Sequence, residues 1–192
     1  MKVLQKYFLA LVPPAEILAQ AHEIKVAVRD QFGIKYALKS PPHITLKMPF
    51  NYNEAKEVQL IESLRRHLEA QDAFQVRIDG VGAFGDRVIF LDIPRSEQLA
   101  HLQQEIGKFC KGQLHLTEEL SDRNYHPHMT VAFKDIKPRQ FKEIFDFVSA
   151  RGFSTEFSAE SVMLLKRLDG TWRLQGVIPF GVDWAKSRFL TR

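Results

Sequence analysis

The sequence predicts an α+β fold that is bilobal and duplicated, with two antiparallel-rich sheets and outer helices around a central cleft. Three observations lead to this prediction. Short apolar runs with the periodicity of strands alternate with segments that have the periodicity of helices. The tetrapeptide Pro-His-x-Thr occurs twice, at residues 42–45 and 127–130. The segments that follow the two copies also match each other, at the same offset of 85 residues.

The first half of the chain reads as strand, helix, strand, helix and two further strands. Pro14 is typical of a first helical turn and Gly33 of a helix end, and Asn53 is a candidate cap for the second helix. The glycine-rich segment 80–86 indicates a hairpin between the last two strands. In order, the predicted elements are a strand at 6–12, a helix from 14 to 33, a strand at 43–50, a helix at 54–70, and strands at 74–80 and 87–94.

The second half reads as helix, strand, helix and a closing strand pair. Ser96 can cap the helix that follows it, and Pro138 opens the other one. A polar connection, residues 111–124, precedes the second Pro-His-x-Thr copy. The predicted strands are 128–133 and the pair 161–167 and 172–180, and no element is predicted for 184–192.

The offset between the two copies indicates an internal duplication. It carries Gly85 onto Gly170, Ile93 onto Ile178 and Pro94 onto Pro179. We therefore expect one bilobal domain over residues 1–192, built of pseudo-repeats at roughly 35–95 and 120–180 and related by a pseudo-two-fold axis. A repeat kept only for packing would explain the Gly, Ile and Pro matches, but it gives no reason for the matched His and Thr.

The composition bounds the class of protein. The chain has 192 residues, of which 45% are hydrophobic and 26% charged, as in an ordinary globular domain. A net charge of +4 suits an anionic substrate, whereas the density of Lys and Arg does not indicate binding to duplex DNA. Cys110, the only cysteine, reads as a packing residue. No stretch predicts a membrane span or a signal peptide, so we expect a cytoplasmic monomer.

Each Pro-His-x-Thr copy predicts a strand with one chemical face. Side chains alternate along a strand, so His43 and Thr45 point to one side, as do His128 and Thr130. The intervening side chains are apolar and suit the core: Ile44, Leu46, Met129 and Val131. If the lobes meet at a two-fold axis, two imidazoles and two hydroxyls face each other across a cleft.

This set of side chains suits attack on a phosphodiester. One neutral imidazole can take a proton from water while the other, protonated, gives a proton to the leaving oxygen. The Thr hydroxyls can donate hydrogen bonds to the non-bridging phosphate oxygens. No metal or other cofactor is needed. By strand alternation Lys47 and Lys134 lie on the same face and can add positive charge there, although both also fit as solvated strand-end lysines.

Two neighbours of the second copy leave alternatives open. His126 and His128 have a spacing that can bind metal, but the motif has no carboxylate or third histidine, so we expect no metal site. Tyr125 and Arg123 suit base stacking and phosphate binding, and equally a loop tyrosine and a solvated arginine.

With these motifs the chain resembles the two-histidine (2H) phosphoesterase superfamily, in particular its 2′-5′ RNA ligase-like branch, which includes bacterial RNA 2′,3′-cyclic phosphodiesterases. The resemblance implies a bilobal fold and metal-independent opening or formation of 2′-linked phosphodiesters. Carried over, it makes His128 the base and His43 the acid. Many RNA-processing relatives have Arg where this chain has Phe133, followed here by Lys134.

The function that we expect is therefore hydrolysis of a cyclic or 2′-linked phosphodiester, most simply the 2′,3′-cyclic phosphate of a nucleotide or an RNA end. Two alternatives remain: a non-catalytic module that binds a nucleotide or RNA end in the same cleft, and a reversible 2′-5′ RNA ligase.

Overall fold

The computed structural model describes residues 3–181, so the segment 184–192, for which no element is predicted, lies outside the described part of the chain. The strands are β1 (Leu4–Leu11), β2 (Ile44–Asn53), β3 (Phe74–Asp79), β4 (Val81–Phe84), β5 (Val88–Asp92), β6 (His128–Phe133), β7 (Ser154–Ala159), β8 (Ser161–Leu168) and β9 (Thr171–Pro179). The helices are α1 (Ala15–Phe32), α2 (Glu57–His67), α3 (Glu97–Gly112), α4 (Leu120–Arg123) and α5 (Phe141–Ser149), with short 3-10 turns η1 (Tyr36–Lys39), η2 (Glu54–Lys56) and η3 (Pro138–Gln140).

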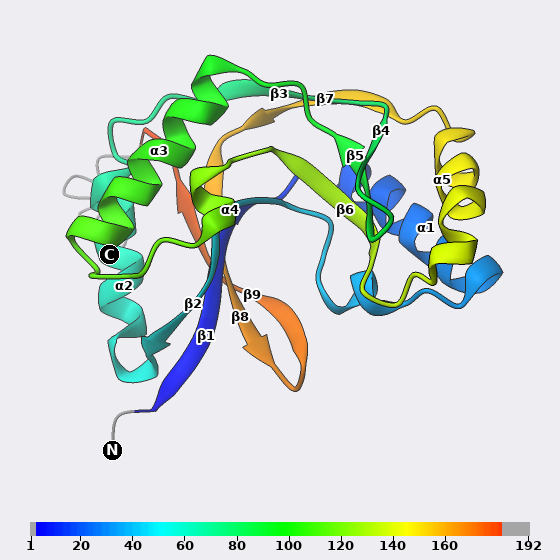
Figure 1. The fold of residues 1–192 in the computed structure, drawn as a ribbon. Helices are drawn as coiled ribbons and strands as arrows, with labels where there is room; N and C mark the ends of the chain where they lie inside the picture. The colour runs from blue at the N-terminus through cyan, green and yellow to red at the C-terminus, as the bar shows by residue number, and fades with distance from the viewer. Residues whose placement is uncertain (1–2, 182–192) are drawn as a thin grey trace.

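The strands form three antiparallel groups, which confirms the predicted α+β class. One sheet has the order β2-β1-β8-β9, a second has the order β4-β5-β6, and β3 pairs with β7 (Figure 1). Helices α2 and α3 lie beside the four-stranded sheet, and α1 and α5 lie beside the three-stranded one (Figure 1). The buried apolar side chains of both sheets and the long helices form one main cluster, so the two halves share a core.

Two helices cross from one sheet to the other. Helix α1 follows β1 of the four-stranded sheet but contacts β6, and α3 follows β5 of the three-stranded sheet but contacts β2. This reciprocal exchange is consistent with a duplicated chain; the pseudo-two-fold axis and the repeat boundaries themselves stay predictions.

The helix boundaries follow the predicted local signals. Helix α1 ends at Gly33, whose φ of 75° is left-handed and is a conformation that glycine adopts at little cost. The Ser96 side chain accepts a hydrogen bond from the backbone N–H of Leu99 at 3.2 Å and so caps α3. Asn53 caps the η2 turn that precedes α2, by accepting from the N–H of Ala55, whereas α2 itself begins after Lys56 without a side-chain cap.

The predicted hairpin between residues 74–80 and 87–94 is wrong. β3 pairs instead with β7, from Phe74 opposite Ala159 to Asp79 opposite Ser154. The hairpin partner of β5 is β4, which lies in the segment interpreted as a loop. β7 carries only two buried residues, Phe157 and Ala159, so its sequence gives little sign of a strand. The long-range pairing of β3 with β7 cannot be read from local periodicity.

The offset of 85 residues also places in register two strands with different neighbours. β5 lies between β4 and β6, whereas β9 pairs with β8 alone among the described strands.

Between residues 3 and 181, no helix combines the length and apolar character that crossing a membrane requires.

Gly82 provides a test of the packing around β5. It lies opposite Phe90, and a Cβ atom at Gly82 would fall 2.4 Å from Cε2 of that ring. Because Phe90 is only 2% exposed, we expect Gly82→Ala to force the ring to shift and to lower the free energy of unfolding by about 1–3 kcal/mol.

The matched control is Gly107→Ala in α3, where a Cβ would meet no heavy atom within 4 Å. There the better helix propensity of Ala should raise stability by up to about 1 kcal/mol. Denaturant unfolding of the two variants checks the pair of expectations, and equal stabilities would contradict the close approach of Gly82 to Phe90.

Candidate active site

The two Pro-His-x-Thr copies stand at the start of two strands that contact each other. His43 directly precedes β2, and His128 is the first residue of β6. The predicted alternation is present in both copies. The side chains of Ile44, Leu46, Met129 and Val131 are 0–1% exposed and belong to the core. The histidines and threonines, on the opposite faces, are half-buried: His43, Thr45, His128 and Thr130.

Both imidazoles are held by the same local hydrogen bond. Nδ1 of His43 lies 2.7 Å from the carbonyl oxygen of Pro41, and Nδ1 of His128 lies 2.7 Å from the carbonyl oxygen of His126. A carbonyl oxygen only accepts, so Nδ1 is the donor in each pair. The tautomer is thereby fixed, and Nε2 is left in each ring as the atom that can take up or release a proton.

Aromatic rings flank both imidazoles. The ring centroid of Phe8 lies 4.7 Å from that of His43, and the centroids of Phe84 and Phe90 lie 4.9 and 5.1 Å from that of His128. These contacts restrict the ring orientations and shield the imidazoles from water.

The electrostatic surroundings of His43 favour its neutral form. Burial lowers its pKa to about 3, and the ammonium of Lys25 contributes in the same direction. A positive charge on His128 also lowers the pKa of His43, so the two imidazoles lie within electrostatic range of each other.

His128 has a more balanced environment. Burial lowers its pKa as well, but the hydrogen bond to the His126 carbonyl and the carboxylate of Asp92 oppose that effect. Asp92 is the cross-strand partner of His128 on β5. Protonation is therefore easier at His128 than at His43.

Lys25 is a buried residue of this region that the sequence analysis missed. Its side chain is 2% exposed, and Nζ donates to the carbonyl oxygens of Ala37 and Ser40, each at 3.1 Å. It makes no ion pair within residues 3–181, and burial lowers its pKa to about 7. Its place among Ala21, Ile24 and Val28 on the apolar face of α1 was the available signal. Lys25 thus anchors the turn that leads to His43.

Lys47 does not lie beside Thr45, which corrects the prediction. Ala10 pairs with Thr45 but Leu9 pairs with Lys47, so Leu46 is an extra residue in β2. This β-bulge turns Lys47 into the core, where it is 3% exposed. Its Nζ forms an ion pair with Asp122 and donates to the carbonyl oxygen of Thr117 at 3.0 Å. Lys47 is therefore a structural residue, not a substrate-binding cation.

A matching bulge occurs in β6. Phe90 pairs with Thr130 and Ile89 with Ala132, so Val131 is the extra residue. As a result Phe133, and not Lys134, lies on the face of Thr130. Lys134 follows the end of the strand with a left-handed φ of 68°, and its Nζ donates to the hydroxyl of Tyr36 at 3.0 Å. The strand alternation used to place Lys134 is wrong, although its ammonium remains exposed.

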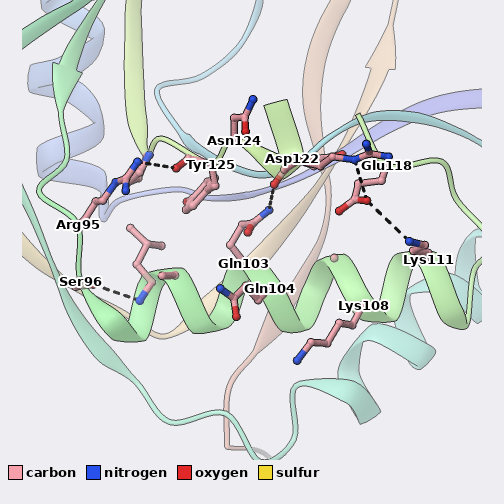
Figure 2. A pocket seen from close by; sticks show the side chains of 15 residues that line it. Arg95, Ser96, Gln103, Gln104, Lys108, Lys111, Glu118, Asp122, Asn124 and Tyr125 are labelled. Carbon is pink, nitrogen blue, oxygen red and sulfur yellow. Dashed lines mark hydrogen bonds and ion pairs between the residues drawn. The ribbon is translucent and has the colours of Figure 1, made fainter. Parts of the chain in front are cut away.

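Tyr125 lines a different pocket. This pocket, of about 690 Å³, runs along α3, and its lining includes neither histidine (Figure 2). The backbone carbonyl of Tyr125 accepts a hydrogen bond from Arg95, and its buried hydroxyl has no hydrogen-bond partner among residues 3–181. Arg123 pairs with Glu118 at 3.2 Å in the same pocket. Neither residue is brought to the histidine pair.

The described residues offer no group of three or more His, Cys, Asp or Glu side chains that could hold a metal ion. Nε2 of His126 lies 3.6 Å from Asp92, and its ring packs on Phe84. His126 thus lies beside His128 and Asp92.

The buried Lys47–Asp122 pair generates a stability prediction. Replacing Lys47 by Met leaves Asp122 charged and buried, so the free energy of unfolding should fall by about 3–5 kcal/mol. Lys142→Met is the control, because the Lys142–Asp146 pair is exposed and worth at most about 1 kcal/mol. Chemical denaturation measures both; a loss below about 1 kcal/mol for Lys47→Met would contradict a buried ion pair.

Lys25 predicts a pH dependence of stability. Its pKa is about 7 in the folded protein, against an ordinary value of 10.5, so between these values the unfolded chain binds one more proton. The free-energy cost of burying Lys25 should therefore fall as the pH rises above 7, and the free energy of unfolding should increase by at most about 1.4 kcal/mol per pH unit. We expect the unfolding free energy of the wild type to increase relative to that of Lys25→Met from about pH 7 to about pH 9. A difference that is flat over this range would show that Lys25 stays charged.

Comparisons with known proteins identify the family of this chain. Residues 13–171 match the family described as the 2′-5′ RNA ligase superfamily. A protein of Oceanobacillus iheyensis, provisionally named a phosphoesterase, is 28% identical over 183 residues, which cover 93% of this chain and 99% of the relative. A protein of Bacillus cytotoxicus with a similar name is 27% identical over 80% of this chain and 87% of the relative.

Solved structures share the fold. TT0787 of Thermus thermophilus superposes with a TM-score of 0.63 at 19% identity, covering 93% of this chain and 99% of that one. LigT of Escherichia coli in complex with 3′-AMP gives a TM-score of 0.61 at 19% identity, covering 94% and 100%. The fold and the family match lead to one conclusion: this chain belongs to the 2′-5′ RNA ligase superfamily of two-histidine phosphoesterases.

Proposed function

We propose that the protein hydrolyses the 2′,3′-cyclic phosphate of a nucleotide or an RNA end, with His43 and His128 as the acid–base pair and without a metal ion. The observation that carries this proposal is the matched pair of Nδ1 hydrogen bonds, which leaves one Nε2 atom per motif for proton transfer. The family supports phosphoesterase chemistry. LigT, which shares the fold, has been crystallised with 3′-AMP and with phosphate, and a 3′-phosphate is one product of opening such a ring.

The proposed reaction is an in-line displacement at phosphorus. One neutral imidazole takes a proton from water, and the water oxygen forms a bond to phosphorus while the bond from phosphorus to one ribose oxygen breaks. The other imidazole, protonated at Nε2, gives its proton to that leaving oxygen. The hydroxyls of Thr45 and Thr130, on the same faces as the histidines, donate hydrogen bonds to the non-bridging oxygens. The product is a phosphate monoester on one ribose hydroxyl.

The surroundings of the two imidazoles favour His43 as the base and His128 as the acid. The deeper burial of His43 and the charge of Lys25 keep it neutral, whereas Asp92 supports the protonated form of His128. This direction is opposite to the one that the family resemblance implies. A symmetric frame permits either direction, and the local charges favour His43 as the base.

The first test is loss of activity. Because one group must accept and the other donate a proton, we expect His43→Ala and His128→Ala each to lower kcat by about 10²–10⁴ on a nucleoside 2′,3′-cyclic phosphate. EDTA should leave wild-type turnover unchanged. Near-normal turnover of either variant would remove that histidine from the mechanism, and joined RNA ends as the main product would favour the reversible ligase.

The roles can be separated by pH and by leaving group. The value of kcat/KM reports the free enzyme, in which the pKa of His128 lies below 6.5, so kcat/KM should fall as pH rises above that lowered pKa. A phosphodiester with a 4-nitrophenol leaving group needs no acid, so it should restore activity to His128→Ala but not to His43→Ala. Rescue of His43→Ala alone would reverse the assignment. Ligand binding with no turnover of any ester would favour the binding module.

A further inference from the structure

Beside the histidine pair lies a cluster of three cations around one tyrosine: Tyr36, Lys39, Lys134 and Arg167, here called the Tyr36 cluster. Tyr36 and Lys39 begin and end η1, Lys134 follows β6, and Arg167 stands near the end of β8. The ammonium of Lys134 lies 4.5 Å from the centroid of the Tyr36 ring, and that of Lys39 lies 4.6 Å from it. The guanidinium of Arg167, which lies over the ring of Trp172, is within electrostatic range of the Tyr36 hydroxyl. Three elements distant in sequence therefore bring positive charge to this region.

No carboxylate in the described part of the chain forms an ion pair with these cations. Within residues 3–181, Lys39, Lys134 and Arg167 take part in none of the ion pairs. Asp135, the acid next in sequence, is already engaged: its Oδ2 accepts hydrogen bonds from the backbone N–H groups of Lys35 and Tyr36, at 2.8 and 2.9 Å. The hydrogen bond from Lys134, together with the charges of Lys39 and Arg167, lowers the pKa of the Tyr36 hydroxyl. The cluster is thus a region of uncompensated positive potential.

The position of Lys134 depends on an unfavourable backbone conformation. Its φ of 68° is left-handed, which is strained for a residue with a Cβ atom. The backbone N–H of Asp135 donates to the carbonyl oxygen of Phe133 at 2.9 Å, and the Asp135 carboxylate fixes the turn to η1. This tight turn keeps the Lys134 ammonium over Tyr36 instead of letting β6 continue.

The cluster adjoins the candidate active site on both sides. Phe133, the last residue of β6, packs edge-on against Tyr36, with centroids 5.0 Å apart. Three residues of strand, roughly 10 Å, separate Phe133 from Thr130. On the other side Arg167 lies over the ring of Trp172, Trp172 packs on Phe8, and Phe8 packs on His43. The cluster is therefore linked by contacting side chains to His43 on one side and to the strand of His128 on the other.

We propose that the Tyr36 cluster binds a second phosphate group of the substrate, so that the preferred substrate class is a 3′-end nucleotide that also carries a 5′-phosphate or a 5′-phosphodiester. This inference rests on the proposed function for its first phosphate, which the histidine pair holds. The second phosphate supplies the anion that three unpaired cations would otherwise lack.

Binding measurements test the proposal whether or not the protein turns over. Titration calorimetry compares three ligands: adenosine 3′-monophosphate, adenosine 3′,5′-bisphosphate and the 3′-phosphorylated dinucleotide ApAp. We expect the second phosphate to tighten binding about tenfold, with a steeper dependence on salt. If only the bisphosphate binds more tightly than adenosine 3′-monophosphate, the site is assigned to mononucleotides. If only ApAp binds more tightly, the site is assigned to RNA ends. Equal affinity of all three ligands would overturn the proposal.

The variants separate binding from folding. Lys134→Gly removes the ammonium and suits the left-handed φ, so the fold should be at least as stable while the preference for the second phosphate falls to about threefold or less. Arg167→Gln should lower the same preference, and Lys142→Gln on the exposed side of α5 should not. If Lys134→Gly and Arg167→Gln retain the full preference, the Tyr36 cluster does not bind the second phosphate. Failure of the proposed function would appear separately, as no hydrolysis of any cyclic ester.

Discussion

The relative position of the two motifs depends on the buried ion pair between Lys47 and Asp122. Lys47 lies on β2, four residues after His43, and Asp122 lies on α4, six residues before His128. Asp122 also accepts from the backbone N–H groups of Met48 and Glu119, at 2.8 and 2.9 Å. A charge pair taken out of water is stable only while both partners stay in place. The approach to the second histidine is therefore fixed to the strand of the first.

The first motif is supported in turn by two charged side chains, Lys25 and Asp135, which bind backbone groups of and next to the η1 turn. The η1 turn, which leads to His43, contacts β6, the strand that begins with His128. Lys25 holds the carbonyl oxygens at the end of this turn, and Asp135 holds its amides. Each motif is thus supported by the other half of the chain. Two imidazoles with the same local hydrogen bond have different affinities for protons, because His43 is more deeply buried and faces the charge of Lys25, whereas the carboxylate of Asp92 supports the protonated form of His128.

Local signals in the sequence predicted most of the elements, the α+β class and the orientation of the histidines and threonines, because capping residues and period-two alternation act over a few residues. They did not predict the pairing of β3 with β7 or the placement of Lys47 and Lys134. Alternation predicts the face to which a side chain points only while the strand is regular. Each motif strand has a bulge directly after its threonine, so the prediction fails for the residues that follow. Lys25 and Asp122 were missed because a charged residue reads as exposed until its partners are known.

The two bulges have different consequences because the residues at matching positions differ. In β2 the residue turned inward is Lys47, which requires a buried carboxylate; in β6 it is Ala132, which requires nothing. The strand β6 consequently brings Phe133 to the face of His128 and Thr130, and Lys134 does not follow on that face. The positive charge comes instead from Lys134, through a left-handed residue held by Asp135. A turn that costs free energy and leaves an ammonium without a carboxylate is hard to explain by folding alone. It is explained if an anion completes the cluster in the working protein.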